Sequence, residues 1–279
     1  MELGRFGIWT AYRAIGAENA GEAARLIEQL GFGTVWLGGS PQVRALRPLL
    51  AAGERLVVAT GILNVWASDP AQVAEDFAVL DAEFPGRVLL GIGIGHPEAQ
   101  GEYTKPLAAM RAFLDALDAA PAPVPRDRRC LAALAPNMLA LCAERSLGSH
   151  TYFVNVEHTR SARAALGPGA LLAPELACVL DEDETSGRAT ARKYAQLYLG
   201  LSNYTNALLR SGSTEDDIAD GGSDRLIDAV VPHGDARAIA AAASEHLAAG
   251  ANHVCLQTVG VSGVPRAEWS ALAGALDLT

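Results

Sequence analysis

The chain is poor in cysteine, in basic residues and in long apolar runs. Its four cysteines form no C-x-x-C pair and stand in apolar surroundings, a pattern typical of buried free thiols. Lys and Arg number 22 against 32 Asp and Glu, and the formal net charge of −10 argues against nucleic acid as a partner. No stretch reaches the roughly 18 apolar residues of a membrane-spanning helix. Met1–Arg5 lacks the pattern of a secretory signal, so a cytoplasmic location is expected.

Apolar residues are abundant, because half of the 279 residues are hydrophobic, and this excludes intrinsic disorder. Segments with helical periodicity alternate with short Val, Ile and Leu runs, which favours a parallel sheet buried on both faces. One (β/α)8 barrel needs about 250 residues. We therefore predict a single α/β domain over residues 1–279, a (β/α)8 TIM barrel. Its eight strands are Phe6–Thr10, Thr34–Leu37, Leu56–Ile62, Val88–Ile94, Cys130–Ala133, Thr151–Val154, Leu172–Leu180 and His253–Gln257.

The surplus over a minimal barrel lies between Asp181 and Asp235. This segment contains one long helical stretch, Ala189–Leu209, and a polar segment, Ser211–Asp224. We expect it to form an insertion before the last helix and strand.

Candidate functional residues follow the strands, because ligands of parallel barrels bind at the carboxyl ends. His96, His158 and the carboxylate of Glu157 stand at such positions, together with several aromatic side chains. This rim is suited to a planar aromatic ligand. The six histidines show neither H-x-H nor H-E-x-x-H spacing, so no metal site is predicted.

One strand carries glycine at alternate positions, Gly91, Gly93 and Gly95, directly before His96. Glycine lets a backbone approach a flat ring closely, but it also relieves crowding inside a barrel, and both interpretations stay open. A dinucleotide-binding G-x-G-x-x-G motif is excluded, because the third glycine and the following helix are missing.

Two segments, Thr60–Pro70 and Pro85–Gly93, together with Gly31–Trp36 and Gly250–Val254, resemble the luciferase-like monooxygenase family. The resemblance is strongest to the branch that uses the deazaflavin coenzyme F420. It covers most of the chain and is weakest from about residue 180 to 235.

The resemblance implies a barrel enzyme that binds a flavin-type ring in its mouth. A bulge with a non-proline cis peptide would lie behind the ring at Gly61–Ile62. Asn64 would meet the polar edge of the ring, and the glycine strand would wall it. The residues implied to contact the cofactor are Gly61, Ile62, Asn64, Gly93, Gly95, Ala133, Leu134, Ala135, Pro136 and His158. Of these, Ala133–Pro136 lead into a helix whose start would favour an anionic group.

His96 and Glu157 are the candidate catalytic residues. The resemblance places His96 near the reacting side of the ring, whereas Glu157 and His158 also fit the first turn of a helix. Trp9, Tyr12 and Trp66 are candidates for the wall of the substrate pocket. Several deazaflavin relatives carry an acid or a histidine after the second strand, where this chain has Gly38-Gly39-Ser40.

Three functions follow from the resemblance. The first is hydride transfer between F420 and a small organic substrate. The second is an FMN-dependent monooxygenase that receives reduced flavin from a partner reductase. The third is a catalytically silent flavin-binding relative, an option that the missing group after the second strand keeps open. Members of the family often pair, so a homodimer is one arrangement, although no interface is visible in the sequence.

Overall fold

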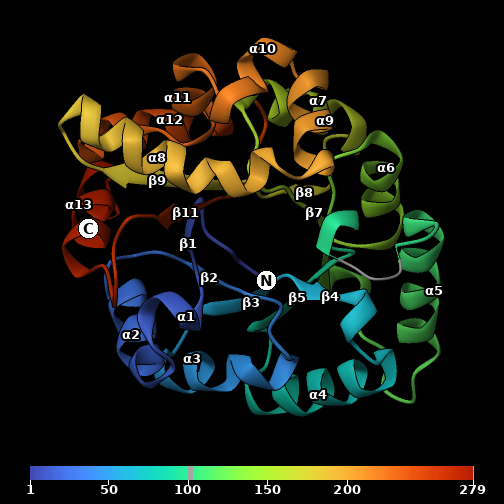
Figure 1. The fold of residues 1–279 in the computed structure, drawn as a ribbon. Coiled ribbons are helices and arrows are strands. Elements are labelled where there is room, and N and C mark those ends of the chain that lie inside the picture. The colour runs from blue at the N-terminus through green and yellow to red at the C-terminus, as the bar shows by residue number, and fades with distance from the viewer. Residues whose placement is uncertain (100–102, 279) are drawn as a thin grey trace.

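The computed structural model describes residues 1–99 and 103–278 of the chain. Helices surround a ring of strands whose carboxyl ends face the viewer in Figure 1. The strands are β1 (Phe6–Thr10), β2 (Thr34–Gly38), β3 (Val57–Gly61), β4 (Leu63–Asn64), β5 (Val88–Gly93), β6 (Arg129–Ala132), β7 (Gly148–His150), β8 (Leu171–Leu172), β9 (Glu175–Leu180), β10 (His233–Gly234) and β11 (Val254–Thr258).

All recorded strand pairs are parallel, and the order is β10-β9-β11-β1-β2-β3-β5-β6-β7-β8, with β4 paired to β5. The sheet closes on itself because β8 and β9 are two parts of one bent strand. Its first part pairs with β7, and its second part pairs with β11. Counting β3 with β4 and β8 with β9 as single strands, and leaving out β10, gives eight barrel strands. The predicted TIM barrel is confirmed.

The helices form the outer layer of the barrel and the segment that covers one end of it. They are α1 (Tyr12–Ile15), α2 (Ala20–Gln29), α3 (Arg47–Ala52), α4 (Pro70–Glu83), α5 (Pro106–Ala119), α6 (Pro136–Arg145), α7 (Val156–Leu166), α8 (Glu184–Leu199), α9 (Ser202–Arg210), α10 (Glu215–Ile218), α11 (Asp224–Val230), α12 (Ala236–Ala248) and α13 (Arg266–Ala275).

Three predicted elements differ from the observed ones. The sixth barrel strand is Gly148–His150, so the prediction Thr151–Val154 was placed too late. The seventh strand breaks at Ala173–Pro174, since proline has no N–H for a continuous ladder. The predicted helix Ala189–Leu209 is two helices, because α8 ends at Leu199 with Gly200 as its C-cap.

Alternate strand residues separate two cores. Val35 and Leu37 of β2 pack outward against the helices, whereas Trp36 between them belongs to the interior of the barrel. The interior also holds polar groups: His150 stacks on the Trp36 ring at 4.2 Å, and Trp36 Nε1 donates to His253 Nε2 at 3.2 Å. Continuous apolar runs therefore bury both faces of each strand.

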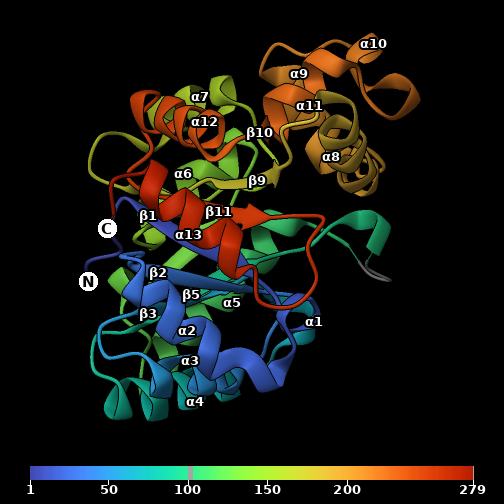
Figure 2. The ribbon, with the colours of Figure 1, turned by 90° about the vertical axis from the view of Figure 1, so that its left-hand side faces the viewer.

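The insertion, defined as α8 to α11, lies over the carboxyl ends of the strands (Figure 2). Ala177 and Val179 of β9 pack against its residues Ala191, Tyr204 and Leu208 in a separate buried cluster. The predicted insertion before the last helix and strand is confirmed. It lies along one side of the barrel end at which the sequence places the candidate site (Figure 1).

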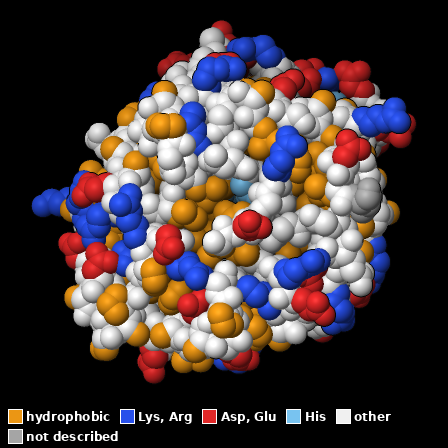
Figure 3. Space-filling model, turned by 180° about the vertical axis from the view of Figure 1, so that it is seen from behind, with side chains coloured by type: hydrophobic (Ala, Val, Ile, Leu, Met, Phe, Trp, Pro, Cys, Tyr) orange, Lys and Arg blue, Asp and Glu red, His pale blue; other side chains and the backbone are white. Residues whose placement is uncertain are grey.

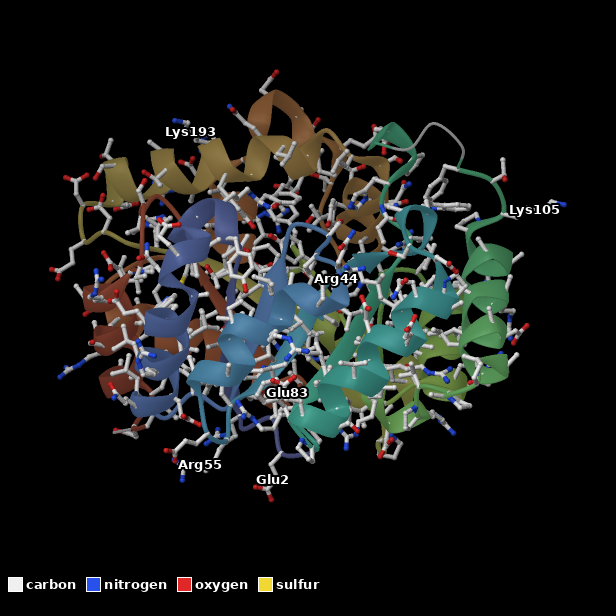
Figure 4. All side chains as sticks on the ribbon, turned by 90° about the horizontal axis from the view of Figure 1, so that it is seen from below. Glu2, Arg44, Arg55, Glu83, Lys105 and Lys193 are labelled. Carbon is white, nitrogen blue, oxygen red and sulfur yellow. The ribbon has the colours of Figure 1, made fainter. Side chains whose placement is uncertain are left out.

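The two ends of the barrel differ in what covers them. At the amino-terminal end, seen in Figure 3, acidic and basic side chains are interspersed around a central apolar area. Figure 4 shows Glu2 and Arg55 at this end, and Lys193 of the insertion at the opposite one. Within the described residues, no helix is both long and apolar enough to cross a membrane.

Candidate functional site

The β3–β4 bulge is the centre of the carboxyl end. The Gly61–Ile62 peptide is cis, as the resemblance implied. After the bulge, Leu63 pairs with Ile92 and Asn64 pairs with Gly93, so the bulge rests on the glycine strand β5. Gly93 is therefore the neighbour of Asn64 across the sheet, whereas Gly61 lies before the bulge and pairs with Gly38 of β2.

The glycines of β5 make room for this bulge. A Cβ atom on Gly91 would lie 1.9 Å from the carbonyl oxygen of Thr60, and one on Gly93 would lie 2.6 Å from Ile62 Cδ1. Gly91 and Gly93 are both buried, whereas Ile62 is half-buried. The sequence left open whether these glycines face a ligand or relieve crowding, and relief of crowding explains Gly91 and Gly93. Ile62 lies over Gly93 and is partly exposed at the mouth.

Trp9, at the end of β1, occupies the space beside the second strand. A Cβ atom on Gly38, the last residue of β2, would lie 2.1 Å from the Trp9 ring, so a side chain has no room at this position. The Trp9 indole is 6% exposed and lies 5.3 Å from the ring of Tyr152. Its Nε1 has no hydrogen-bond partner within the described residues. Trp9 thus belongs to the buried interior of the barrel near the carboxyl end of β1, and its role in the substrate wall stays a prediction.

Asn64 and Trp66 stabilise the turn after the bulge. Asn64 Oδ1 accepts from the backbone N–H of Trp66 at 3.0 Å, and Trp66 Nε1 donates to the carbonyl of Ile94 at 2.7 Å. Both side chains are half-buried. The Asn64 oxygen is therefore engaged in the turn, and its amide N–H groups are the part available to a ligand.

His96 follows β5 and is held by the insertion. Asn203 of α9 places its Nδ2 atom 3.3 Å from His96 Nδ1 and 3.3 Å from the carbonyl of Gly95. The ring of Tyr204 lies 4.8 Å from the His96 ring. Burial lowers the pKa of His96, and the nearby Glu98 carboxylate opposes this shift only in part. A neutral imidazole is therefore favoured at the mouth.

A group of hydrogen-bonded side chains, here called the tyrosine hub, joins the insertion to the barrel. Tyr152 donates to Gln257 Oε1 at 2.8 Å, and its hydroxyl also bonds to Tyr194 at 2.7 Å and to Tyr198 at 3.0 Å. Tyr194 and Tyr198 come from α8, whereas Tyr152 and Gln257 belong to the barrel. Burial raises the pKa of each tyrosine, so all three stay neutral donors.

Glu175 is a buried acid at the start of β9. It is 1% exposed, and its Oε2 accepts from the backbone N–H of Phe153 at 3.2 Å. Its other oxygen has no partner within the described residues. Burial raises the pKa of Glu175 to about 8, so the carboxyl group is mostly protonated at neutral pH.

The start of α6 forms a separate polar corner of the same end. Ala133 is buried, Leu134 is half-buried, and Ala135 and Pro136 are exposed. His158 Nε2 lies 3.1 Å from the carbonyl oxygen of Leu134, and Arg210 of the insertion lies 3.4 Å from the same oxygen. This corner combines a helix N-terminus with a cationic side chain, an arrangement that suits an anion.

Two candidates from the sequence lie elsewhere. Glu157 does not contact His96 within the described residues; its side chain is 62% exposed and pairs with Arg160. It lines a separate cavity of about 350 Å³ together with residues of α11 and α12. Tyr12 donates its hydroxyl to the carbonyl of Ala45 at 2.6 Å and packs against the outer core, so it belongs to the scaffold. Both side chains thus have partners outside the group around His96, and their roles in the site stay predictions.

The sequence missed the contributions of the insertion, namely Tyr194, Tyr198, Asn203, Tyr204 and Arg210. One signal was available, because Tyr194 and Tyr198 stand four residues apart and share a helix face. Few apolar residues stand near these tyrosines in the sequence, so the pattern does not show which face of the helix covers the barrel.

The sequence profile described as "Luciferase-like monooxygenase" matches residues 2–254 of the chain. The chain belongs to the luciferase-like monooxygenase family. The resemblance to this family that the sequence showed is thereby confirmed. For this luciferase-like protein, the matched region includes the whole insertion and ends at the first residue of β11.

Three similar proteins illustrate the range of the family. An F420-dependent glucose-6-phosphate dehydrogenase of Microbacterium testaceum is 33% identical over 113 residues, which are 36% of this chain and only 33% of that protein. The structure of an F420-dependent secondary alcohol dehydrogenase, solved with an F420-acetone adduct, has a TM-score of 0.77 at 15% identity and covers 99% of both chains. The FMN complex of the oxygenating constituent of 3,6-diketocamphane monooxygenase of Pseudomonas putida has a TM-score of 0.69 at 11% identity, covering 99% of this chain and 96% of that one.

Proposed function

We propose that this luciferase-like protein is an oxidoreductase that transfers a hydride between coenzyme F420 and a small organic substrate at the mouth of the barrel. The observation that carries the proposal is the convergence of Ile62, His96 and the start of α6 at one barrel end, under the insertion. The relatives named for F420, one of them 33% identical over the matched residues, support this cofactor.

The buried polar atoms of the site fit a group of this kind. Trp9 Nε1 and His158 Nδ1 are buried without partners within the described residues. Such a group costs about 1–3 kcal/mol unless a ligand or water satisfies it. Arg210 and the N-terminus of α6 lie beside His158 and supply a place for a negative charge. A ring with polar edges and an anionic side chain would use both features.

The chain's own residues then have separate tasks. Ile62 and the amide of Asn64 would lie against the ring, and Gly95 would leave space beside it. The backbone of Ala133–Pro136, with His158 and Arg210, would hold the anionic side chain. When bound, the deazaflavin supplies or accepts the hydride. Trp9 and Trp66 would bound the substrate, and the insertion with its tyrosine hub would exclude water from the reacting atoms.

Titration of the purified protein with F420 and, separately, with FMN tests the cofactor. We expect F420 binding that changes the absorbance of the coenzyme, and oxidation of reduced F420 by members of a panel of small carbonyl compounds. Arg210→Ala should weaken F420 binding at least about tenfold, since a charge-assisted contact contributes roughly 1.5–3 kcal/mol. Arg237→Ala, which changes an exposed arginine at the start of α12, is the matched control.

Tight binding of FMN without binding of F420 would favour the second candidate, an FMN-dependent monooxygenase supplied with reduced flavin by a partner reductase. The likeness to a structure described as an FMN complex supports this alternative.

Binding of F420 without turnover of any compound in the panel would instead favour a silent cofactor-binding relative. The segment Leu37–Ser40, where the resemblance implies an acid or a histidine in several deazaflavin relatives, supports this third outcome, because Trp9 lies against Gly38. A homodimer also remains a proposal, to be measured by sedimentation of the purified protein.

A further inference from the structure

The contact between Asn203 and His96 joins two parts of the chain that are 107 residues apart. Asn203 is the second residue of α9, in the insertion, and His96 follows β5 of the barrel. Asn203 Nδ2 lies 3.3 Å from His96 Nδ1, 3.3 Å from the carbonyl oxygen of Gly95 and 3.4 Å from the hydroxyl of Tyr103. One amide group therefore meets three atoms of the segment that carries His96.

The Gly95 carbonyl decides which way this amide faces. A backbone carbonyl only accepts hydrogen bonds, so the Asn203 atom beside it must be the nitrogen. An amide nitrogen donates two hydrogens and accepts none. This nitrogen has three acceptors within 3.4 Å for its two hydrogens, and a hydrogen on His96 Nδ1 would point at a donor. The geometry therefore favours His96 Nδ1 as an acceptor. An accepting Nδ1 carries no hydrogen, and in a neutral imidazole the hydrogen is therefore on Nε2.

Other contacts of α9 keep this geometry in place. The backbone N–H of Ser202 donates to Glu98 Oε1 at 2.9 Å, and the Tyr204 ring packs against His96. The titratable groups around the imidazole are Glu98 on its own loop, Tyr103 before α5 and Tyr204 on α9. Of these, Glu98 alone favours a charged imidazole, and burial outweighs it, because the pKa of His96 is lowered. Asn203 and the ring of Tyr204 therefore both contact an imidazole that is neutral.

We propose that Asn203 is a positioning residue that fixes His96 as the Nε2–H tautomer, so that His96 presents a hydrogen-bond donor to an oxygen atom of the substrate. Within the described residues Nε2 has no protein partner and is not a buried orphan atom, so it is available to a ligand. The role assigned to the substrate rests on the proposed function, whereas the tautomer does not. The fitting substrates are carbonyl compounds and alcohols, whose oxygen can accept this bond.

The tautomer can be measured without cofactor or substrate. In protein labelled with ¹⁵N-histidine, the nitrogen chemical shifts of His96, assigned with the His96→Gln variant, distinguish a protonated Nε2 from a protonated Nδ1. We expect Nε2–H in the wild type at pH 7 to 8. Asn203→Asp should move the hydrogen to Nδ1 and raise the pKa of His96, because a carboxylate accepts where the amide donated. Asn203→Leu, which donates nothing, should leave a mixture of tautomers.

Asn206→Asp is the matched control, because Asn206 is exposed, lies on the same helix and gives the same change of charge. It should leave the His96 signals unchanged. If Asn203→Asp fails to fold, the wild type and Asn203→Leu still decide the question. A wild-type His96 with its hydrogen on Nδ1 would overturn the inference, and so would an unchanged tautomer in both Asn203 variants.

Steady-state kinetics test the donor role. Loss of one positioned donor lowers kcat by about 100-fold in comparable sites. We expect Asn203→Asp to show such a loss of kcat with little change in KM, and only above the raised pKa of His96, below which Nε2 still carries a proton. In a His96→Leu background, which has no donor or acceptor at this position, Asn203→Asp should have no further effect. An additive loss in that background would refute the positioning role.

Absence of F420 turnover in the wild type would count against the proposed function alone, because the nitrogen shifts would still report the tautomer. Conversely, normal turnover with a Nδ1–H tautomer would refute the positioning role and leave the oxidoreductase proposal intact. The two failures are therefore distinguishable in one set of proteins.

Discussion

The barrel wall and the insertion above it are built from different side chains. Strand β2 buries all five of its residues, and its neighbours are equally apolar. The insertion shares an apolar cluster with β9, and it also meets the barrel through hydroxyl, amide and guanidinium groups, from Tyr194, Tyr198, Asn203 and Arg210. Apolar packing fixes the wall, because it is large and non-directional. In the insertion, directional hydrogen bonds add to the apolar contacts and orient the side chains that reach the mouth. Changes in the wall should therefore reduce stability, whereas changes at the insertion should affect activity.

The largest effect on stability is expected for Gly91→Ala in the wall. The new Cβ atom would lie 1.9 Å from the Thr60 carbonyl oxygen, a backbone atom that cannot turn away. We expect a loss of about 3 kcal/mol in the free energy of unfolding, measured by urea denaturation. Gly274→Ala, in α13 with no atom within 4 Å of the added Cβ, should change stability by less than about 1 kcal/mol. Equal losses for both variants would contradict the packing argument.

His96→Leu should have the largest effect on activity with little effect on stability. The imidazole is half-buried at the mouth, and leucine, unlike glutamine, would remove the hydrogen-bond donor that we propose for His96. We expect kcat for oxidation of reduced F420 to fall about 100-fold. The midpoint of urea unfolding should change little. A variant with full kcat would place the reacting atoms elsewhere.

Glu175 gives the barrel interior a pH-dependent stability. Because its pKa in the folded state is raised to about 8 from 4.5, the folded state binds more protons than the unfolded one between these values. Stability from this group is fully present below the unfolded pKa and is lost as pH rises toward 8. The loss should be roughly 2 kcal/mol between about pH 6 and about pH 7.5.

Urea denaturation of the wild type and of Glu175→Gln at several pH values tests this. The amide keeps the shape and does not titrate, so the variant should lack this part of the decline. His150, His246 and His253 have pKa values lowered to about 4 and give the opposite slope between about pH 4 and 6.5. They are present in both proteins and cancel in the comparison. A parallel pH dependence of the two proteins would show that Glu175 is ionised at neutral pH.

The smallest effect is expected for Tyr152→Phe in the tyrosine hub. The change removes the hydroxyl that bonds to Gln257, Tyr194 and Tyr198, and Tyr194 keeps its own 3.3 Å contact with Gln257 Oε1. Because Tyr194 then remains as the donor to Gln257, we expect a net loss of about 1 kcal/mol. In native-state hydrogen exchange, the backbone amides of α8 should exchange faster in the variant than in the wild type, whereas those of the barrel strands should exchange at the wild-type rate. Faster exchange spread evenly over the barrel would mean that the insertion is not a separate unit.

Much of the barrel could be predicted from local patterns. Continuous apolar runs marked β1, β2 and β5, and Gly31 ended α2 as a helix terminator should, because these signals depend on a few neighbouring residues. The site was predicted only in part. His96 lies at the mouth, but Glu157 points to a different cavity, and the residues that hold His96 come from a segment that resembles the family least. Strand-end position gives the edge of a barrel and leaves the direction of each side chain undetermined.

The sequence by itself determined the parallel barrel and the family, because periodicity and short glycine-containing segments are local properties. The tertiary structure alone decided that Trp9 fills the space over Gly38 and that β5 glycines accommodate the bulge. It also decided that Asn203 reaches His96 across more than a hundred residues. These contacts depend on which surfaces the closed barrel and its insertion bring within hydrogen-bonding distance, and no local pattern encodes that distance.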